Sequence, residues 1–271
     1  MDKATAEAPA VLVDITDGIG WITLNRPEQL NTLSRELEEL LFETTAKFET
    51  DPEVRCVVIR AQGKHFMAGG DIKAFAADLE RGDERYFRGF ESRVVDAHQT
   101  ISQLRRMPKP VLVSVQGAVA GFGMSLVMAG DLAIASEDAF FTLAYRHIGL
   151  SADGGASYFL PRLVGERRAL EIILLGDRFD VRRAHDLGIV NFVVPRADLA
   201  AETEKLAIRL ASGPTVALGL AKRLVRSSLD NSWDEQSHRE AEAIATAVRT
   251  EDHHEGVRAF IEKRPPTFRG R

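Results

Sequence analysis

The chain has 271 residues, with 45% hydrophobic and 28% charged side chains, a formal net charge of −5 and an isoelectric point near 5.9. This length suits one large domain with a helical extension, and the composition excludes disordered and fibrous proteins. The acidic balance argues against nucleic acid as a main partner, since basic side chains occur only in short clusters.

The expected elements begin with a loose tail at 1–9, which lacks the apolar stretch of a signal peptide. We therefore expect a cytoplasmic protein. A β-hairpin follows, because the β-prone runs 11–14 and 19–24 flank the turn signal Asp17-Gly18. The fold thus starts with strands.

A helix and two buried strands are expected next. Ser34 can cap a helix that runs to about Glu49. The β-branched runs 54–60 and 110–115 are bounded by Pro or Gly, which is typical of strands covered on both faces. Cys56, the only cysteine, lies in the first of these runs, so we expect a buried thiol in a reducing compartment.

The region between these strands is charged with scattered apolar residues. It predicts a helix within 78–107, preceded by a mobile loop around 81–83 of the kind that covers a ligand. The next segment, 110–130, is uncharged and long enough to raise the question of a membrane span. Pro110 and four glycines interrupt it, so we expect a buried strand, a glycine turn and a buried helix, and no membrane partner.

Alternating elements fill the rest of the core. Helices are expected at 125–130, 167–175 and 182–187, with a strand at 131–135. This strand–helix–strand order implies parallel pairing. From 199 onward the pattern is almost purely helical, with one clear break at 213–214. We therefore expect a core over 10–198 and a C-terminal helical region over 199–271.

Two glycine-rich segments, 65–73 and 117–125, each follow an expected strand. Glycines at a strand end let backbone N–H groups face a ligand oxygen, and a helix that begins there adds positive potential. Two such turns can form an oxyanion hole, although their spacing alone is equally consistent with tight packing. Neither segment has the pattern of a phosphate-binding or dinucleotide-binding loop.

Ordered motifs extend along nearly the whole chain: Leu24-Asn25-Arg26-Pro27, Phe66-x-Ala68-Gly69-x-Asp71-Ile72, Gly117-x-x-x-Gly121-x-Gly123 and Asp131-Leu132-Ala133-Ile134-Ala135. They resemble the enoyl-CoA hydratase/isomerase, or crotonase, family, with a pattern closest to the phenylacetate-pathway isomerase that acts on a ring-epoxide thioester. The resemblance implies an α/β fold class with a crotonase-like spiral core of repeated ββα turns, and a helical C-terminal region that supports trimers or dimers of trimers. It also implies an acyl-CoA substrate and no metal or redox cofactor, because CoA belongs to the substrate.

The same resemblance assigns site residues by position. The oxyanion donors carry over onto the backbone N–H groups of Gly70 and Phe122, and loss of one such donor typically costs about 3 kcal/mol of transition-state stabilisation. The neighbouring positions expected to contact the acyl-CoA are Ala68, Gly69, Asp71, Ile72 and Gly121. In such families Phe260 and Lys263 can approach the nucleotide end of CoA bound to a neighbouring subunit.

Two positions depart from the hydratase pattern. Where typical hydratases carry two glutamates that position and activate water, this chain has Ser125 and Tyr145. A serine and a tyrosine cannot replace two carboxylates as acid and base at neutral pH without large pKa shifts. The pattern therefore disfavours hydration, and both residues are expected to line the acyl-CoA pocket instead.

Asp153 is the expected catalytic acid. It lies in a small and apolar stretch, 148–155, where partial desolvation would raise the pKa of its carboxyl and suit it to carry a proton. In the family this position holds the proton carrier of several isomerases. From the residues alone, an aspartate before two glycines is more often a turn former or a helix cap.

The expected reaction is a double-bond shift, with a thioester enolate held by the two N–H groups while Asp153 moves the proton. The alternatives are water addition, thioester hydrolysis or dehalogenation, and a non-catalytic scaffold that binds CoA or RNA. The acidic net charge argues against RNA binding. The run 252–255 could bind a metal, yet we expect a solvated helix face. His65 and His147 are expected to pack or hydrogen-bond rather than to catalyse.

Overall fold

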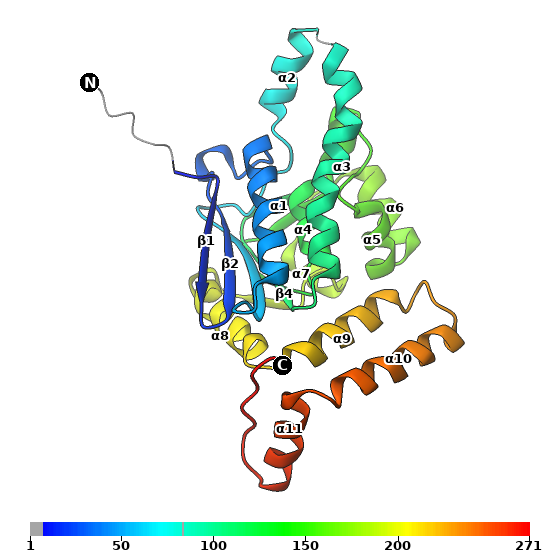
Figure 1. Ribbon diagram of the computed structural model, residues 1–271. Helices are drawn as coiled ribbons and strands as arrows, with labels where there is room; N and C mark the ends of the chain where they lie inside the picture. The colour runs from blue at the N-terminus through cyan, green and yellow to red at the C-terminus, as the bar shows by residue number, and fades with distance from the viewer. Residues whose placement is uncertain (1–7, 83) are drawn as a thin grey trace, which may run out of the picture.

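The computed structural model describes residues 8–82 and 84–271 (Figure 1). Most of the tail expected at 1–9 lies outside the described residues, as does Asp83 of the loop expected around 81–83. Helices α1 (Arg35–Thr50) and α3 (Glu84–Arg106) run side by side along the main sheet, while α2 (Ile72–Glu80) projects at the end of the molecule opposite the C-terminal helices (Figure 1).

The larger sheet contains β1 (Val11–Thr16), β2 (Ile19–Leu24), β3 (Cys56–Ala61), β4 (Val111–Val115), β6 (Leu132–Ser136) and β9 (Phe192–Val194), in that order. β1 and β2 are antiparallel and every later pair is parallel, which confirms the expected hairpin and the parallel pairing. The hairpin turn suits Asp17 and Gly18, because both adopt positive φ angles, 53° and 75°.

Three shorter strands, β5 (Ala118–Ala120), β7 (Phe140–Thr142) and β8 (Phe179–Asp180), form a second sheet in the order β5-β7-β8. The chain adds a strand to each sheet in turn, β4 then β5 and β6 then β7, with helices between the turns. This arrangement is the expected spiral of ββα turns. The short strands leave no trace in the sequence pattern, because two or three residues show no usable alternation.

Helices connect the strands and cover the sheets. They include α4 (Phe122–Ala129), α5 (Ala156–Val164), α6 (Glu166–Leu175) and α7 (Val181–Asp186), with short 3-10 turns at η1 (Pro27–Gln29), η2 (Ala144–Ile148) and η3 (Arg196–Asp198). Ser34 caps α1 as expected, since its Oγ accepts a hydrogen bond from Leu37 N at 3.2 Å. α3 confirms the helix expected within 78–107, whereas α2 is additional. α5 has no sequence signal, because no side chain caps its start and Pro161 stands inside it.

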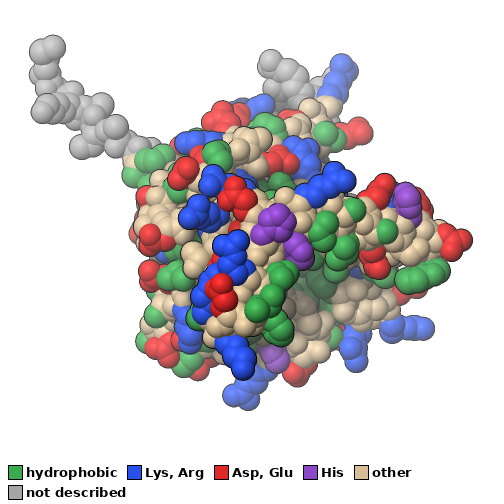
Figure 2. Space-filling model, turned by 60° about the horizontal axis from the view of Figure 1, so that its bottom comes forward, with side chains coloured by type: hydrophobic (Ala, Val, Ile, Leu, Met, Phe, Trp, Pro, Cys, Tyr) green, Lys and Arg blue, Asp and Glu red, His purple; other side chains and the backbone are tan. Residues whose placement is uncertain are grey.

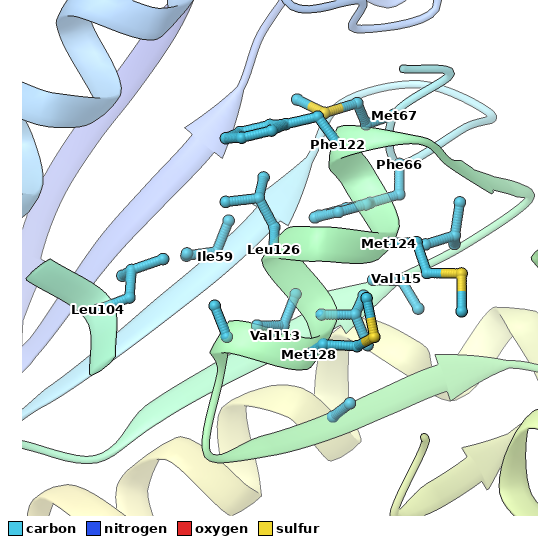
Figure 3. Packing of buried hydrophobic residues seen from close by; sticks show 14 of the residues in the cluster. Ile59, Phe66, Met67, Leu104, Val113, Val115, Phe122, Met124, Leu126 and Met128 are labelled. Carbon is cyan, nitrogen blue, oxygen red and sulfur yellow. The ribbon is translucent and has the colours of Figure 1, made fainter. Parts of the chain in front are cut away.

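The main core surrounds α4, whose side chains are all buried. Figure 3 shows Leu126 and Met128 of this helix among side chains from β3, β4 and α3, with Phe122 beside Met67 at its start. A helix that is apolar all round must be enclosed by the rest of the domain. The first turn of α4 is therefore held rigidly, which matters for the site described below.

The uncharged segment 110–130 forms β4, β5 and α4, as expected for a buried strand, a glycine turn and a buried helix. None of the helices in the described part of the chain combines the length and the hydropathy that a bilayer crossing needs. Cys56 is buried in β3, as expected, and burial raises the pKa of its thiol to about 12.

The first helix of the C-terminal region packs on the large sheet. It is α8 (Leu199–Ala211), whose Leu199, Ala207 and Ala211 join a second buried cluster with residues of β2, β3, β4 and β6. The remaining helices, α9 (Thr215–Ser227), α10 (Trp233–Ala247) and α11 (Glu251–Ile261), extend away from the sheets (Figure 1). The prediction of a single clear break at 213–214 was wrong, because the chain also breaks before α10 and before α11, where Ser232 and Thr250 cap the next helix.

A buried ion cluster ties α9 to the core. Asp131, directly before β6, lies 2.8 Å from Lys222 Nζ and also pairs with Arg226. Burial raises the pKa of Asp131 and lowers the pKa of Lys222, and each charge opposes the shift of the other. The two cations are the reason why an aspartate can be buried here.

Candidate active site

The two glycine-rich segments lie against each other. Met67 N donates to Ala118 O at 3.1 Å, and Ala120 N donates to Met67 O at 2.8 Å, so the segments pair like parallel strands. Gly69 and Gly121 meet where the pairing ends, with φ angles of 92° and 51°. A Cβ atom on Gly121 would lie 3.2 Å from Gly69 Cα, so this approach requires glycine.

Two backbone donors follow these glycines. Gly70 comes directly after Gly69, and Phe122 is the first residue of α4. Within the described residues, neither the Gly70 N–H nor the Phe122 N–H has a hydrogen-bond acceptor, and both residues line the same cavity. The start of α4 adds positive potential there. The structure thus brings both predicted donors to one cavity, where they are free to bind an oxygen atom.

The cavity has a volume of about 250 Å³. Its walls are mainly apolar and include Phe75, Phe90, Val94, Ala97, Ile148 and Leu150. Among the described residues, five polar side chains also line it: Glu38, Arg93, Tyr145, His147 and Asp153. A mostly apolar cavity with a few convergent polar groups is the usual form of a small-molecule site.

Asp153 is half-buried in this cavity, and its backbone is fixed from two sides. The Asp153 carbonyl accepts hydrogen bonds from Ser125 Oγ at 3.2 Å and from Ala156 N at 3.0 Å. The Tyr145 hydroxyl donates to Asp153 Oδ1 at 2.5 Å. Asp153 Oδ2 has no hydrogen-bond partner in the described part of the chain, so one carboxyl oxygen is held and the other is free.

Tyr145 is a donor rather than a base. Burial raises the pKa of its hydroxyl, and the negative charge of Asp153 raises it further. The phenol therefore stays protonated at neutral pH and keeps its hydrogen bond to the carboxylate. Its oxygen also lies near the glycine turns, since a Cβ atom on Gly121 would be 3.7 Å away.

His98 supports the Asp153 turn and was not found by sequence analysis. Its Nε2, on α3, accepts a hydrogen bond from Gly154 N at 3.0 Å. Gly154 has a φ of 60°, and a Cβ atom there would lie 2.5 Å from Ser125 Oγ. A lone histidine on an amphipathic helix, far from Asp153 in sequence, gives no signal of such a contact.

The expected contact residues divide into two groups. Ala68, Gly69, Ile72, Gly121 and Tyr145 line the cavity together with the two donors and Asp153. Two others are placed differently. Asp71 caps α2, with its Oδ1 accepting from Ala74 N at 3.1 Å, and Ser125 is fully buried behind Asp153. Neither lines the cavity, so both support the site from outside it.

Phe260 and Lys263 lie far from the cavity within one chain. Phe260 lies in the last turn of α11 and Lys263 just after that helix, at the opposite end of the molecule from α2 (Figure 1). Phe260 is 85% exposed and lines a separate groove of about 460 Å³ formed by the C-terminal helices. A single chain therefore does not bring them to the predicted site.

The remaining histidines and the acidic run have structural contacts. His65 Nδ1 accepts from Ala118 N at 3.0 Å, which agrees with the expected hydrogen-bonding role. His147 Nε2 lies 3.2 Å from Gly176 O. The expectation of a solvated face at 252–255 was wrong for Asp252, which is buried and accepts from the backbone N–H groups of Arg269 and Gly270. That contact holds the C-terminal segment.

Comparison with known proteins adds independent information. The family model for enoyl-CoA hydratase/isomerase matches residues 14–271. The chain is 35% identical to 1,2-epoxyphenylacetyl-CoA isomerase of Escherichia coli strain K12, over 96% of this chain and 98% of that protein. It is 32% identical to trans-2-decenoyl-(acyl-carrier-protein) isomerase of Streptococcus mutans, over 96% and 98%. A crystal structure of an enoyl-CoA hydratase from Polaromonas sp. JS666 has a TM-score of 0.88 and 32% identity, covering 95% of this chain and 99% of that one.

Proposed function

The chain belongs to the enoyl-CoA hydratase/isomerase family of the crotonase superfamily, and from this premise we propose that it shifts a carbon–carbon double bond in an acyl-CoA thioester, with Asp153 as the proton carrier. The observation that carries the proposal is the half-buried Asp153 carboxyl, held on one oxygen by Tyr145, in the same cavity as two N–H donors that have no acceptor among the described residues. The relatives of this chain include both isomerases and hydratases, so the choice between these two reactions rests on the residues of the site.

In the proposed mechanism the thioester carbonyl oxygen binds between the Gly70 and Phe122 N–H groups. These donors stabilise the negative charge that develops on this oxygen when a proton leaves the neighbouring carbon, by about 3 kcal/mol for each donor. Because the donors are fixed by strand pairing and by the buried α4, little reorganisation is needed during the reaction.

Asp153 then transfers one proton between two carbons. Its free Oδ2 takes the proton from the acyl chain, the electron pair of the broken C–H bond enters the enolate, and the same oxygen returns the proton to another carbon as the double bond moves. Tyr145 holds the carboxyl in place throughout. No metal or redox cofactor takes part in this proposal, and CoA is part of the substrate.

Water addition is the second candidate, and the positions of two side chains weigh against it. Ser125 is buried outside the cavity, and Tyr145 keeps its proton. Neither supplies a carboxylate beside Asp153 to activate water, as general acid–base hydration needs. The site therefore favours proton relocation over hydration.

We further propose that the C-terminal helices join copies of this chain, as a homotrimer or a dimer of trimers. Hydrophobic side chains gather on the face that these helices form (Figure 2). The most exposed are Val225, Leu229, Trp233, Ile244, Phe260 and Ile261. A large exposed apolar surface is typical of a protein interface. In such an assembly Phe260 and Lys263 would approach the CoA of a neighbouring subunit.

Solvent deuterium exchange into a panel of 2-enoyl-, 3-enoyl- and arylacetyl-CoA thioesters tests the reaction. We expect wild type to incorporate deuterium and move the double bond, and Asp153→Asn to lose both. Asp186→Asn is the matched control, because that side chain is 82% exposed. Water addition that survives in Asp153→Asn, or no exchange with any thioester, would contradict the isomerase proposal.

A further inference from the structure

Glu38 is a second carboxylate on the wall of the cavity. It lies on α1, one residue after the buried Leu37, and lines the cavity together with Val94 and Ala97 of α3. Its Oε1 is buried and has no hydrogen-bond partner among the described residues. Buried polar atoms in native proteins are almost always paired, so an unpaired carboxyl oxygen in a ligand cavity calls for a ligand group.

The neighbouring cations are occupied elsewhere. Arg93 lies 3.7 Å from Asp78 and stacks its guanidinium over the rings of Phe75 and Phe90. Arg35 pairs with Glu39 at 3.4 Å. Burial raises the pKa of Glu38 and the nearby charge of Asp96 raises it further, while the charges of Arg93 and Arg35 oppose this rise without cancelling it.

Glu38 also marks one end of the cavity. A second cavity of about 210 Å³ lies between α1 and α3 and is lined by Phe42, Asp96 and Gln99. Among the described residues, only Glu38 and Arg93 line both cavities. The second cavity includes neither glycine turn, and all its lining residues belong to α1 and α3, so the two cavities meet on the α1 and α3 side of the main one. An acyl group whose thioester binds the Gly70 and Phe122 donors would extend toward Glu38.

We propose that Glu38 selects acyl thioesters that carry a hydroxyl group on the acyl chain, remote from the thioester. The inference rests on the proposed function, since it assumes that an acyl thioester occupies the cavity. A hydroxyl can donate to an ionised carboxylate and accept from a protonated one, so it pairs with Glu38 in either state. A plain hydrocarbon chain would leave the buried oxygen unpaired and would bind less well.

The test compares two enoyl-CoA thioesters that differ only by a distal hydroxyl. For wild type we expect kcat/KM to favour the hydroxylated thioester by about tenfold or more, the scale of one hydrogen bond to a charged group. Glu38→Leu should abolish this preference and improve turnover of the plain thioester, and Glu38→Gln should keep part of it. Glu39→Gln, on the same helix and 66% exposed, is the matched control and should behave like wild type.

Two results would overturn the inference: a preference ratio that Glu38→Leu leaves unchanged, or a wild-type enzyme that favours the plain thioester. Folding is checked by thermal melting, where Glu38→Leu should melt at or above the wild-type temperature, because it removes an unpaired buried acid. If Glu38→Leu does not fold, Glu38→Gln carries the comparison.

The experiment also separates this inference from the proposed function. Asp153-dependent turnover of the plain thioester together with an unchanged ratio would reject only the role of Glu38. If no thioester reacts, the proposed function fails. The Glu38 inference is then judged by calorimetric binding of two saturated acyl-CoA thioesters, one with the distal hydroxyl and one without it. A Glu38-dependent affinity difference would support it, and equal affinities would reject it.

Discussion

The Tyr145 hydroxyl donates a hydrogen bond to Asp153 Oδ1 across 2.5 Å, and this contact joins η2, the turn after β7, to the turn before α5. It occupies one carboxyl oxygen and leaves the other without a hydrogen-bond partner among the described residues. In the hydratase pattern the position of Tyr145 would hold a glutamate, so this chain has a hydrogen-bond donor where a hydratase has a second acid–base group. The proposed chemistry with a single carboxylate follows from this replacement of glutamate by tyrosine.

Removing the Tyr145 hydroxyl should slow the reaction. In Tyr145→Phe the Asp153 carboxyl loses its orienting donor, and we expect kcat for double-bond migration to fall by about 10- to 100-fold with a smaller change in KM, because misplacement of a catalytic group chiefly affects the chemical step. Tyr158→Phe is the control, since its hydroxyl bonds to Asp230 on the surface. An unchanged kcat in Tyr145→Phe would show that the contact has no catalytic role.

A methyl group at Gly154 should displace the catalytic turn. In Gly154→Ala the new Cβ would lie 2.5 Å from Ser125 Oγ at a φ of 60°, so the turn must move and Asp153 with it. We expect a loss of about 100-fold in kcat/KM. Gly165→Ala has the same kind of backbone strain, with a φ of 80°, but its Cβ would meet no atom within 4 Å. Equal effects of the two variants on activity would rule out the proposed displacement.

The buried ion cluster should stabilise the attachment of α9. Lys222→Met leaves the buried Asp131 with one fewer cation, and we expect the free energy of unfolding to fall by about 3 kcal/mol in urea titrations. Adding Asp131→Asn to this variant should recover part of the loss, because the uncompensated charge is gone. Lys205→Met, which breaks an exposed pair with Glu202, should change stability by about 0.5 kcal/mol or less. Similar effects of the two lysine variants would contradict this account.

The protein should lose stability in mild acid because of the protonation of His65. Burial lowers the pKa of His65 from its usual 6.5, and the nearby charge of Lys64 lowers it further. The His65 imidazole therefore binds a proton more readily in the unfolded chain than in the folded one. Its contribution to the free energy of unfolding is complete above about pH 6.5 and falls as the pH drops through that value toward the lower pKa of the folded state.

Urea unfolding between pH 5 and pH 7 measures this effect. His65→Asn should flatten the decline, because the amide oxygen cannot be protonated in this range but can accept from Ala118 N. His185→Asn, at a side chain that is 52% exposed, is the control. If the free energy of unfolding falls with pH as steeply in His65→Asn as in wild type, the effect belongs to other groups.

The parallel strands and glycine turns could be predicted because their signals are local. Cys56 to Ala61 and Val111 to Val115 are apolar runs with clear boundaries, and each glycine segment follows such a run. Asp153 became a catalytic prediction only through resemblance, since its own neighbours indicate a turn. The structure adds the contact with Tyr145 that no pattern in either segment specifies.

The missed features depend on contacts between distant segments. His98 meets Gly154 and Glu38 meets the cavity only because α1 and α3 pack beside the spiral. Glu38 carries a faint signal, as an acid between the core-facing Leu37 and Leu41, but such an acid usually reaches solvent. Asp252 was misjudged for the same reason, because its partners lie near the C-terminus, at Arg269 and Gly270.

The pairing of the two glycine segments has a consequence for hydrogen exchange. Met67 N and Ala120 N are bonded across the pairing, so their amide hydrogens exchange only when this structure opens. Gly70 and Phe122, a few residues further on, carry amide hydrogens without acceptors in the described structure. The proposed anion site should therefore stand out in the free enzyme as two fast-exchanging amides beside slow ones. An acyl thioester that binds there would make all four slow.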